Sequence, residues 1–128
     1  MKDIFSQKLI AETACGHDGS KIILKKLIDV AKYCGAETIK FQIFKVEERA
    51  LPKTKEWSIF NKLELCVKDW EECINYSKKN KLNIISDVYG DKSFEIAQKN
   101  NYDYIVTNAK IEEAAKELIE IIEKKIVP

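Results

Sequence analysis

Two residues of opposite charge, Glu12 and Lys40, fall in segments whose residue types favour β-strands. Apolar and polar residues alternate across 37–44, which puts Lys40 and Gln42 on one side of that strand near its carboxyl end. A carboxylate and an ammonium on neighbouring strands form either a structural ion pair or part of a reactive site, and the residue types alone leave both open.

Metal and disulfide chemistry find less support in the sequence. The four cysteines, Cys15, Cys34, Cys66 and Cys73, contain no C-x-x-C pair, and the single histidine, His17, does not complete a zinc-site spacing. A reducing compartment would keep these cysteines as thiols. We therefore expect them to be small buried apolar residues.

The apolar pattern predicts strands that alternate with helices. Ser20 is expected to cap the first long helix and Gly35 to end it. Trp70, Cys73, Ile74 and Ser77 form one face of a later helix. The predicted strands are 8–14, 37–44, 82–88 and 102–107, with 126–128 as the start of a fifth. The predicted helices are 20–34, 57–63, one that carries 70–77, a short one that Asp91 caps and that bears Phe94 and Ala97, and 111–124. In the last helix, the residues expected to face inward are Ala114, Ala115, Leu118, Ile121 and Ile122.

This β-α-β-α order is typical of a parallel sheet, in either a doubly wound fold or a (β/α) barrel. The polar face of 37–44 favours the barrel, which directs such residues into its mouth. A whole barrel needs about 250 residues. The sequence therefore predicts an α/β fold, a partial TIM-type (β/α) barrel of about four β/α units, as one domain over 1–128.

A half barrel with all its helices on one face would leave the other face and both sheet edges bare. Three outcomes are open. The chain is a fragment of a longer protein, it pairs with a second copy or with a complementing second half, or its sheet is covered in another way.

Composition excludes several classes of partner. The 22 Lys+Arg and 21 Asp+Glu residues leave a formal charge of +1, so no large field attracts nucleic acid or an anionic membrane. No apolar run approaches the roughly 20 residues that span a bilayer, and the amino terminus lacks a secretory apolar region. We expect a cytoplasmic protein.

Three ordered motifs resemble one enzyme family. Residues 9–12 (LIAE) with 16–20 (GHDGS) resemble the "IAE…NH-x-GS" opening of the sialic acid synthases, which include N-acetylneuraminate synthase and its pseudaminic and legionaminic relatives. Residues 35–42 (GAETIKFQ) resemble that family's second strand with its "KFQ" motif. Residues 63–65 (LEL) before 69–70 (DW) resemble its entry to the second helix. The resemblance spans roughly 8–128, the first half of the family's barrel.

The resemblance implies an activity and a set of site residues. The family condenses phosphoenolpyruvate with an N-acylated mannosamine-type sugar and uses a divalent metal such as Mn²⁺ or Mg²⁺, whose histidine ligands belong to later strands. It implies that Lys40 pairs with the anionic groups of phosphoenolpyruvate and that Glu12 transfers or orients a proton near the reacting carbon. Gln42, His17 and Ser86 would contact substrate or shape the site.

The sequence also departs from the family's pattern. Ile105 stands where a lysine grips phosphoenolpyruvate, and Lys110 stands where an acidic residue follows. Asp87 replaces the threonine that meets the phosphate, and a carboxylate there repels a phosphate. Gly16 replaces an asparagine.

Two hypotheses follow from the match and its departures. In the first, the chain is the amino-terminal part of a synthase and is incompetent by itself. In the second, it is a diverged, non-catalytic barrel remnant that serves as a ligand-binding or oligomeric scaffold.

Overall fold

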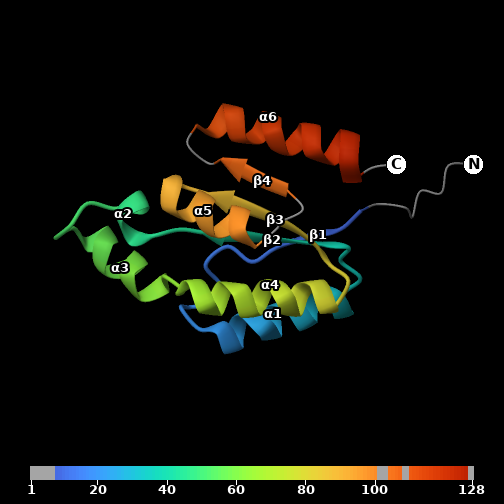
Figure 1. The fold of residues 1–128 in the computed structure, drawn as a ribbon, viewed down its shortest axis with the longest axis horizontal. Helices are drawn as coiled ribbons and strands as arrows, with labels where there is room; N and C mark the ends of the chain where they lie inside the picture. Colours follow the sequence, from blue (N-terminus) through green and yellow to red (C-terminus); the bar gives the residue numbers. More distant parts are fainter. Residues whose placement is uncertain (1–7, 101–103, 108–109, 127–128) are drawn as a thin grey trace, which may run out of the picture.

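The computed structural model describes residues 8–100, 104–107 and 110–126. Strands and helices alternate along the chain, and two short helices extend beyond the carboxyl end of the second strand (Figure 1). The elements are β1 (Ile10–Glu12), α1 (Lys21–Tyr33), β2 (Thr38–Ile43), α2 (Val46–Arg49), α3 (Lys55–Leu63), α4 (Val67–Lys79), β3 (Asn83–Val88), α5 (Asp91–Lys99), β4 (Tyr104–Thr107), α6 (Ile111–Ile121) and the π-helix η1 (Ile122–Ile126).

The four strands form one parallel sheet in the order β1-β2-β3-β4. Glu12 lies in register with Lys40, and Gln42 lies in register with Asp87. Paired residues of parallel strands point to the same face. A sheet in which each new strand is added beside the last, in chain order, has the topology of a (β/α) barrel wall.

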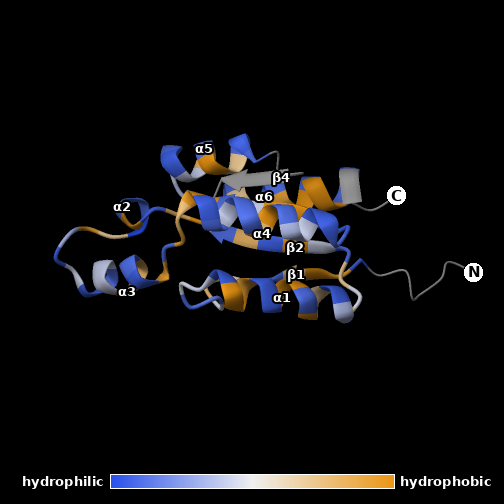
Figure 2. Cartoon of the chain, turned by 60° about the horizontal axis from the view of Figure 1, so that its bottom comes forward, coloured by the Kyte–Doolittle hydropathy of each residue, from blue (hydrophilic) through white to orange (hydrophobic). Residues whose placement is uncertain are grey.

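One face of the sheet carries the main core. Ile39, Phe41 and Ile43 of β2 pack with Leu24 and Ile28 of α1 in a single buried cluster. Trp70 and Ile74 of α4 and Ile96 of α5 join the same cluster, so these three connecting helices cover one face. The apolar stripes that cover it alternate with hydrophilic residues along the helices (Figure 2).

The last helix lies on the opposite face. Ala114, Leu118 and Ile121 of α6 pack against Ile85 and Ile10, which share the inner face of the sheet with Lys40. Figure 1 shows the sheet between α6 and the pair α1 and α4. The expectation that all helices lie on one face is therefore wrong for α6. No strand follows α6 among the described residues, so no crossover to a further strand fixes its side, and it buries the apolar surface that a complete barrel would cover.

The predicted helix ends are mostly confirmed. Ser20 caps α1 by accepting a hydrogen bond from the Ile23 amide, and Gly35 follows the helix with a φ of 84°. Position 19 also requires a glycine, because its φ is 72° and an added Cβ would lie 2.2 Å from the Lys62 carbonyl oxygen.

Other predictions about these elements are wrong. Gly90, not Asp91, is the residue before α5, although α5 carries Phe94 and Ala97 as predicted. Ala115 is exposed on α6. Ile126 belongs to η1 and not to a fifth strand, while residues 127–128 lie outside the described residues.

The four cysteines are free thiols, but they are not uniformly buried. Only Cys73 lies in the core; Cys34 and Cys66 are exposed and Cys15 is half-buried. The prediction of buried cysteines is therefore wrong for Cys34 and Cys66. Both lie at helix ends, where they are the residues after α1 and before α4.

The position of α6 predicts unequal effects for two neighbouring substitutions. Leu118 packs against the inner face, whereas Ile119 is 53% exposed. We expect Leu118→Lys to lower the free energy of unfolding by about 1–2 kcal/mol through loss of apolar burial, and Ile119→Lys to leave it nearly unchanged. Urea unfolding measures both, and equal effects would contradict the packing of α6 on the sheet.

Candidate functional site

Three charged side chains meet on the inner face of the sheet, toward its carboxyl end. The Nζ atom of Lys40 lies 2.6 Å from Oε2 of Glu12 and 2.6 Å from Oδ2 of Asp87. The side chain of Asp87 is 6% exposed, that of Lys40 15% and that of Glu12 39%. The exposure thus rises from β3 to β1, and the cluster opens toward Glu12. We call Glu12, Lys40 and Asp87 the inner charge cluster.

Backbone contacts fix the position of Glu12. The Thr13 amide and hydroxyl both donate to the Lys40 carbonyl oxygen, at 3.1 Å each. The Ala14 amide donates to Oε1 of Glu12 at 2.9 Å, and Ala14 itself has a φ of 45°. A non-glycine residue in the left-handed region is held there by its surroundings. The turn after β1 therefore orients the carboxylate toward Lys40.

The inner charge cluster keeps Lys40 charged. Burial opposes the ammonium, but the hydrogen bonds that Lys40 donates to Asp87 and Glu12 together outweigh it, so the pKa of Lys40 is raised. Burial also raises the pKa of Asp87, and the Lys40 ammonium offsets this only in part. The cluster contains two carboxylates and one ammonium, so it carries a net negative charge when all three groups are ionised.

Gln42 lies on the same face as Lys40, two residues further toward the carboxyl end of β2. Its Oε1 atom accepts a long contact of 3.9 Å from the Cys15 thiol. Gln42 is half-buried and therefore adjoins the cluster, as the strand alternation predicts.

His17 has a structural environment. Its ring is fully buried and meets the Trp70 ring edge-on, with centroids 5.9 Å apart. Nδ1 accepts a hydrogen bond from the Gly19 amide at 3.0 Å, which shapes the loop before α1. The described residues offer no partner to Nε2. The structure places His17 in the core, and a substrate contact by His17 stays a prediction that this burial does not support.

Ser86 is not brought to the inner charge cluster. Its register partner is Phe41, which packs on Trp70 in the helix-covered core. Its side chain is therefore on the other face from Lys40, and its hydroxyl donates to the Asp87 carbonyl oxygen at 3.2 Å. The resemblance placed Ser86 at the site by motif position, whereas the period of the strand turns its side chain away.

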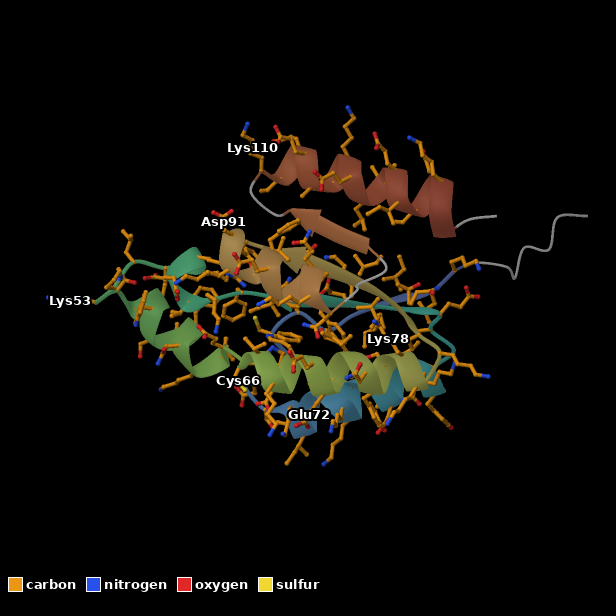
Figure 3. The ribbon with its side chains drawn as sticks, in the orientation of Figure 1. Lys53, Cys66, Glu72, Lys78, Asp91 and Lys110 are labelled. Atoms are coloured by element: carbon orange, nitrogen blue, oxygen red, sulfur yellow. The ribbon has the colours of Figure 1, made fainter. Side chains whose placement is uncertain are left out.

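The residues that depart from the family's motifs lie in different places. Asp87 enters the inner charge cluster directly. Ile105 lies in register with Ser86 on β4. Lys110 is exposed at the start of α6, where it pairs with Glu113 at 3.2 Å and points away from the sheet (Figure 3). Lys110 is thus the residue that precedes α6.

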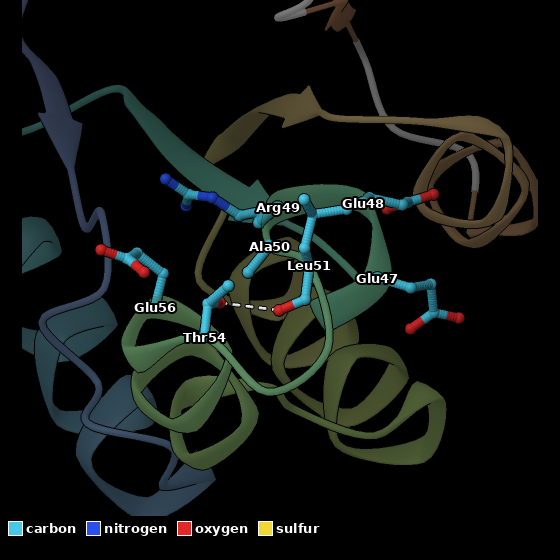
Figure 4. Close-up of a pocket in the computed structure, with 7 residues that line it drawn as sticks. All are labelled: Glu47, Glu48, Arg49, Ala50, Leu51, Thr54 and Glu56. Atoms are coloured by element: carbon cyan, nitrogen blue, oxygen red, sulfur yellow. Dashed lines mark hydrogen bonds between the residues drawn. The ribbon is translucent and has the colours of Figure 1, made fainter.

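Arg49 is a site residue that the sequence reasoning missed. Its guanidinium carbon lies 4.2 Å, 4.4 Å and 5.2 Å from the ring centroids of Phe60, Tyr89 and Phe44. It also lines a pocket of about 440 Å³ at the carboxyl end of the sheet (Figure 4). One signal could have found it, because Arg49 is the only arginine in the sequence.

The described residues do not fit a metal site. They contain no group of three or more histidine, cysteine, aspartate or glutamate side chains placed to hold an ion. Glu12 and Asp87 both accept from Lys40, and His17 already uses Nδ1. We therefore derive no step through a metal from these side chains.

The parallel sheet, its chain-order topology and the charged residues at its carboxyl end define an incomplete (β/α)-barrel protein. The model of the NeuB family matches residues 27–126. The chain belongs to the NeuB family. No helix within the described residues is long and apolar enough to cross a membrane.

Two curated relatives share this part of the sequence. The uncharacterized protein MJ1065 of Methanocaldococcus jannaschii is 34% identical over 93 residues, which are 73% of this chain and 28% of that protein. The N,N'-diacetyllegionaminic acid synthase of Campylobacter jejuni is 29% identical over 102 residues, which cover 69% of this chain and 30% of that enzyme. The chain thus spans about a third or less of these relatives.

Solved structures show the same fold. The N-acetylneuraminic acid synthetase of Leptospira borgpetersenii, crystallised with citrate, superposes with a TM-score of 0.72 at 17% identity, over 91% of this chain and 50% of that one. A putative spore coat polysaccharide biosynthesis protein E of Chromobacterium violaceum superposes with a TM-score of 0.68 at 17% identity, over 90% of this chain and 38% of that one. The partial-barrel prediction is confirmed.

The inner charge cluster predicts a large effect of Lys40→Met. Loss of the Lys40 ammonium would leave the buried Asp87 carboxylate without a cation. We therefore expect the free energy of unfolding to fall by about 3 kcal/mol near neutral pH. The deficit should shrink at acidic pH, where Asp87 becomes protonated, and Asp87→Asn added to Lys40→Met should recover part of it. Lys21→Met, which breaks pairs with Asp69 and Glu72 that are more exposed than the Lys40–Asp87 pair, is the matched control and should change stability much less. Additive effects of the two cluster variants would contradict the contact.

His17 predicts a pH dependence of stability. Burial lowers its pKa below 6.5, with Asp18 acting weakly in the opposite direction. Between the unfolded and the folded pKa of His17, the unfolded chain binds a proton at this residue and the folded chain does not. The free energy of unfolding should therefore fall as the pH drops below 6.5 and level off once the pH is below the folded pKa. Urea unfolding at about pH 7.5 and about pH 5.5 should show a smaller change for His17→Gln than for the native chain. An identical pH slope in both proteins would contradict the burial of a neutral imidazole.

Proposed function

We propose that this chain is the amino-terminal half of a sialic-acid-synthase-type barrel that helps condense phosphoenolpyruvate with an N-acylmannosamine-type sugar. The observation that carries the proposal is the meeting of Glu12 and Lys40 at 2.6 Å on the inner face. In a (β/α) barrel this end of the sheet is where catalytic residues lie. The related synthase of Campylobacter jejuni supports the class of product, a nonulosonic acid.

The proposed roles follow from the charges. Lys40 would donate to the carboxylate or phosphate of phosphoenolpyruvate, since a partly buried ammonium makes strong charge-assisted hydrogen bonds to such groups. Glu12 is the more exposed carboxylate and would move or orient a proton beside the reacting carbon. Gln42 would add a neutral hydrogen bond at the same edge.

The condensation would need parts that the described residues lack. A divalent metal would take its ligands from a second half of the barrel, either on a complementing polypeptide or in a longer protein. A homo-oligomer is the other form in which the inner face could be completed. We place the reaction in the cytoplasm, where phosphoenolpyruvate is made.

A second candidate function is a non-catalytic, ligand-binding or oligomeric barrel remnant. Asp87 favours it, because its carboxylate pairs with the Lys40 ammonium at 2.6 Å and would repel an incoming phosphate. Ile105 removes a second cation from the family's pattern.

Asp87→Asn discriminates between these functions. It keeps the shape of the side chain and removes the competing charge, so we expect phosphoenolpyruvate to bind about tenfold more tightly. Calorimetric titration measures the affinity, and Lys40→Met added to Asp87→Asn should abolish the gain. Phosphate release with N-acetylmannosamine and Mn²⁺ should appear only when the carboxyl-terminal half of a related barrel is supplied. Its absence there, for the native chain and for Asp87→Asn, would support the remnant.

A further inference from the structure

Arg49 is held in place from several directions. The Glu64 carboxylate accepts from the Lys45 ammonium at 2.8 Å and from the Val46 amide at 2.7 Å, which anchors the start of α2. Glu48 accepts from the Lys45 amide and from the Ser93 amide, at 3.0 Å each, which ties α2 to α5. The short helix that carries Arg49 is therefore fixed to the rest of the sheet's carboxyl end.

The guanidinium of Arg49 is also confined by aromatic rings. Phe44 stands edge-on to both Phe60 and Tyr89, at centroid distances of 5.7 Å and 6.4 Å, and the guanidinium lies over all three rings. Stacking on ring faces holds a guanidinium in one plane and leaves the N–H groups at its edge to bind other groups.

One of those N–H groups lacks an acceptor. Nη1 of Arg49 is buried and has no hydrogen-bond partner among the described residues. A buried donor without an acceptor costs free energy. By contrast, Lys40 donates to two carboxylates, Lys45 to Glu64 and Lys92 to Glu47.

Arg49 adjoins the inner charge cluster through Cys15. The charge of the Arg49 guanidinium, and a hydrogen bond between it and the Cys15 thiol, counter in part the rise in the pKa of that thiol that burial causes. The thiol in turn lies 3.9 Å from Oε1 of Gln42, on the same face as Lys40. A small ligand at the carboxyl end of the sheet could therefore reach both Arg49 and the cluster.

We propose that Arg49 is a further oxyanion-binding residue at this end of the sheet, and that it takes one anionic group, a carboxylate or a phosphate, of a small ligand. The ligand class rests on the proposed function, but the assignment to Arg49 rests on the aromatic rings and the unpartnered Nη1. A planar guanidinium matches the paired oxygens of either group.

Three carboxylates line the same pocket and set limits on this binding. Glu48 is occupied by backbone amides and Glu47 by Lys92, whereas Glu56 lines the pocket from α3 (Figure 4). Glu56 therefore opposes an anion at Arg49, and removing its charge should strengthen binding.

The test titrates the native chain with phosphate, pyruvate and phosphoenolpyruvate, and follows binding by calorimetry. Saturation by phosphate or by pyruvate identifies which oxyanion Arg49 prefers. We expect Arg49→Met to weaken binding about tenfold or more, Arg49→Lys to weaken it less, and Glu56→Gln to strengthen it. Lys8→Met removes a positive charge from an exposed pair with Glu37, at the amino end of the sheet and away from this pocket, and is the matched control, which should bind like the native chain. No saturable binding by any of the three anions, or equal binding by native and Arg49→Met proteins, would overturn the proposal.

A second readout uses the native chain alone, in case Arg49→Met does not fold. Cys15 lies beside Arg49, whereas Cys34 is exposed at the end of α1. A bound oxyanion should slow alkylation of Cys15 by neutral iodoacetamide several-fold and leave Cys34 unchanged, as measured by mass spectrometry. Unchanged Cys15 reactivity under saturating anion would contradict binding at this place. Loss of binding in Arg49→Met but not in Lys40→Met would support Arg49 while rejecting the role proposed for Lys40.

Discussion

The whole inner face of the sheet depends on one ammonium group shared by two carboxylates. Lys40 lies at 2.6 Å from both Glu12 and Asp87, and each of the three residues comes from a different strand. The cluster therefore joins β1, β2 and β3 by side chains where their backbone ladder already runs in register. Removing Lys40 leaves the buried carboxylate of Asp87 without a cation, which makes the register of β2 against β3 costly to change.

The same ammonium limits the chemistry of the site. A lysine at this position suits an anionic substrate, but here its charge is already balanced by the chain's own carboxylates. Asp87 is the residue that makes the difference, because it is the more buried of the two and lies on the strand next to β2. Arg49, which adjoins the Cys15 thiol, offers a donor that the cluster does not occupy.

Local pattern predicts much of this fold. The alternation over 37–44 places Lys40 and Gln42 together on one face, and Ser20 and Gly35 bound the first helix as expected. The side taken by α6 could not be predicted in this way, because its apolar stripe says that it packs but not on which face of the sheet. The burial of His17 depends on Trp70, a residue of a distant helix, and so escapes local reasoning too.

Nuclear magnetic resonance of the lysine side-chain ammonium groups tests the shared ammonium most directly. The account predicts a slowly exchanging Lys40 signal that persists near neutral pH and shifts when either Glu12 or Asp87 is replaced. Lys110, which is exposed, supplies the comparison within the same spectrum. A Lys40 signal that exchanges as fast as that of Lys110, or that responds to neither replacement, would contradict it.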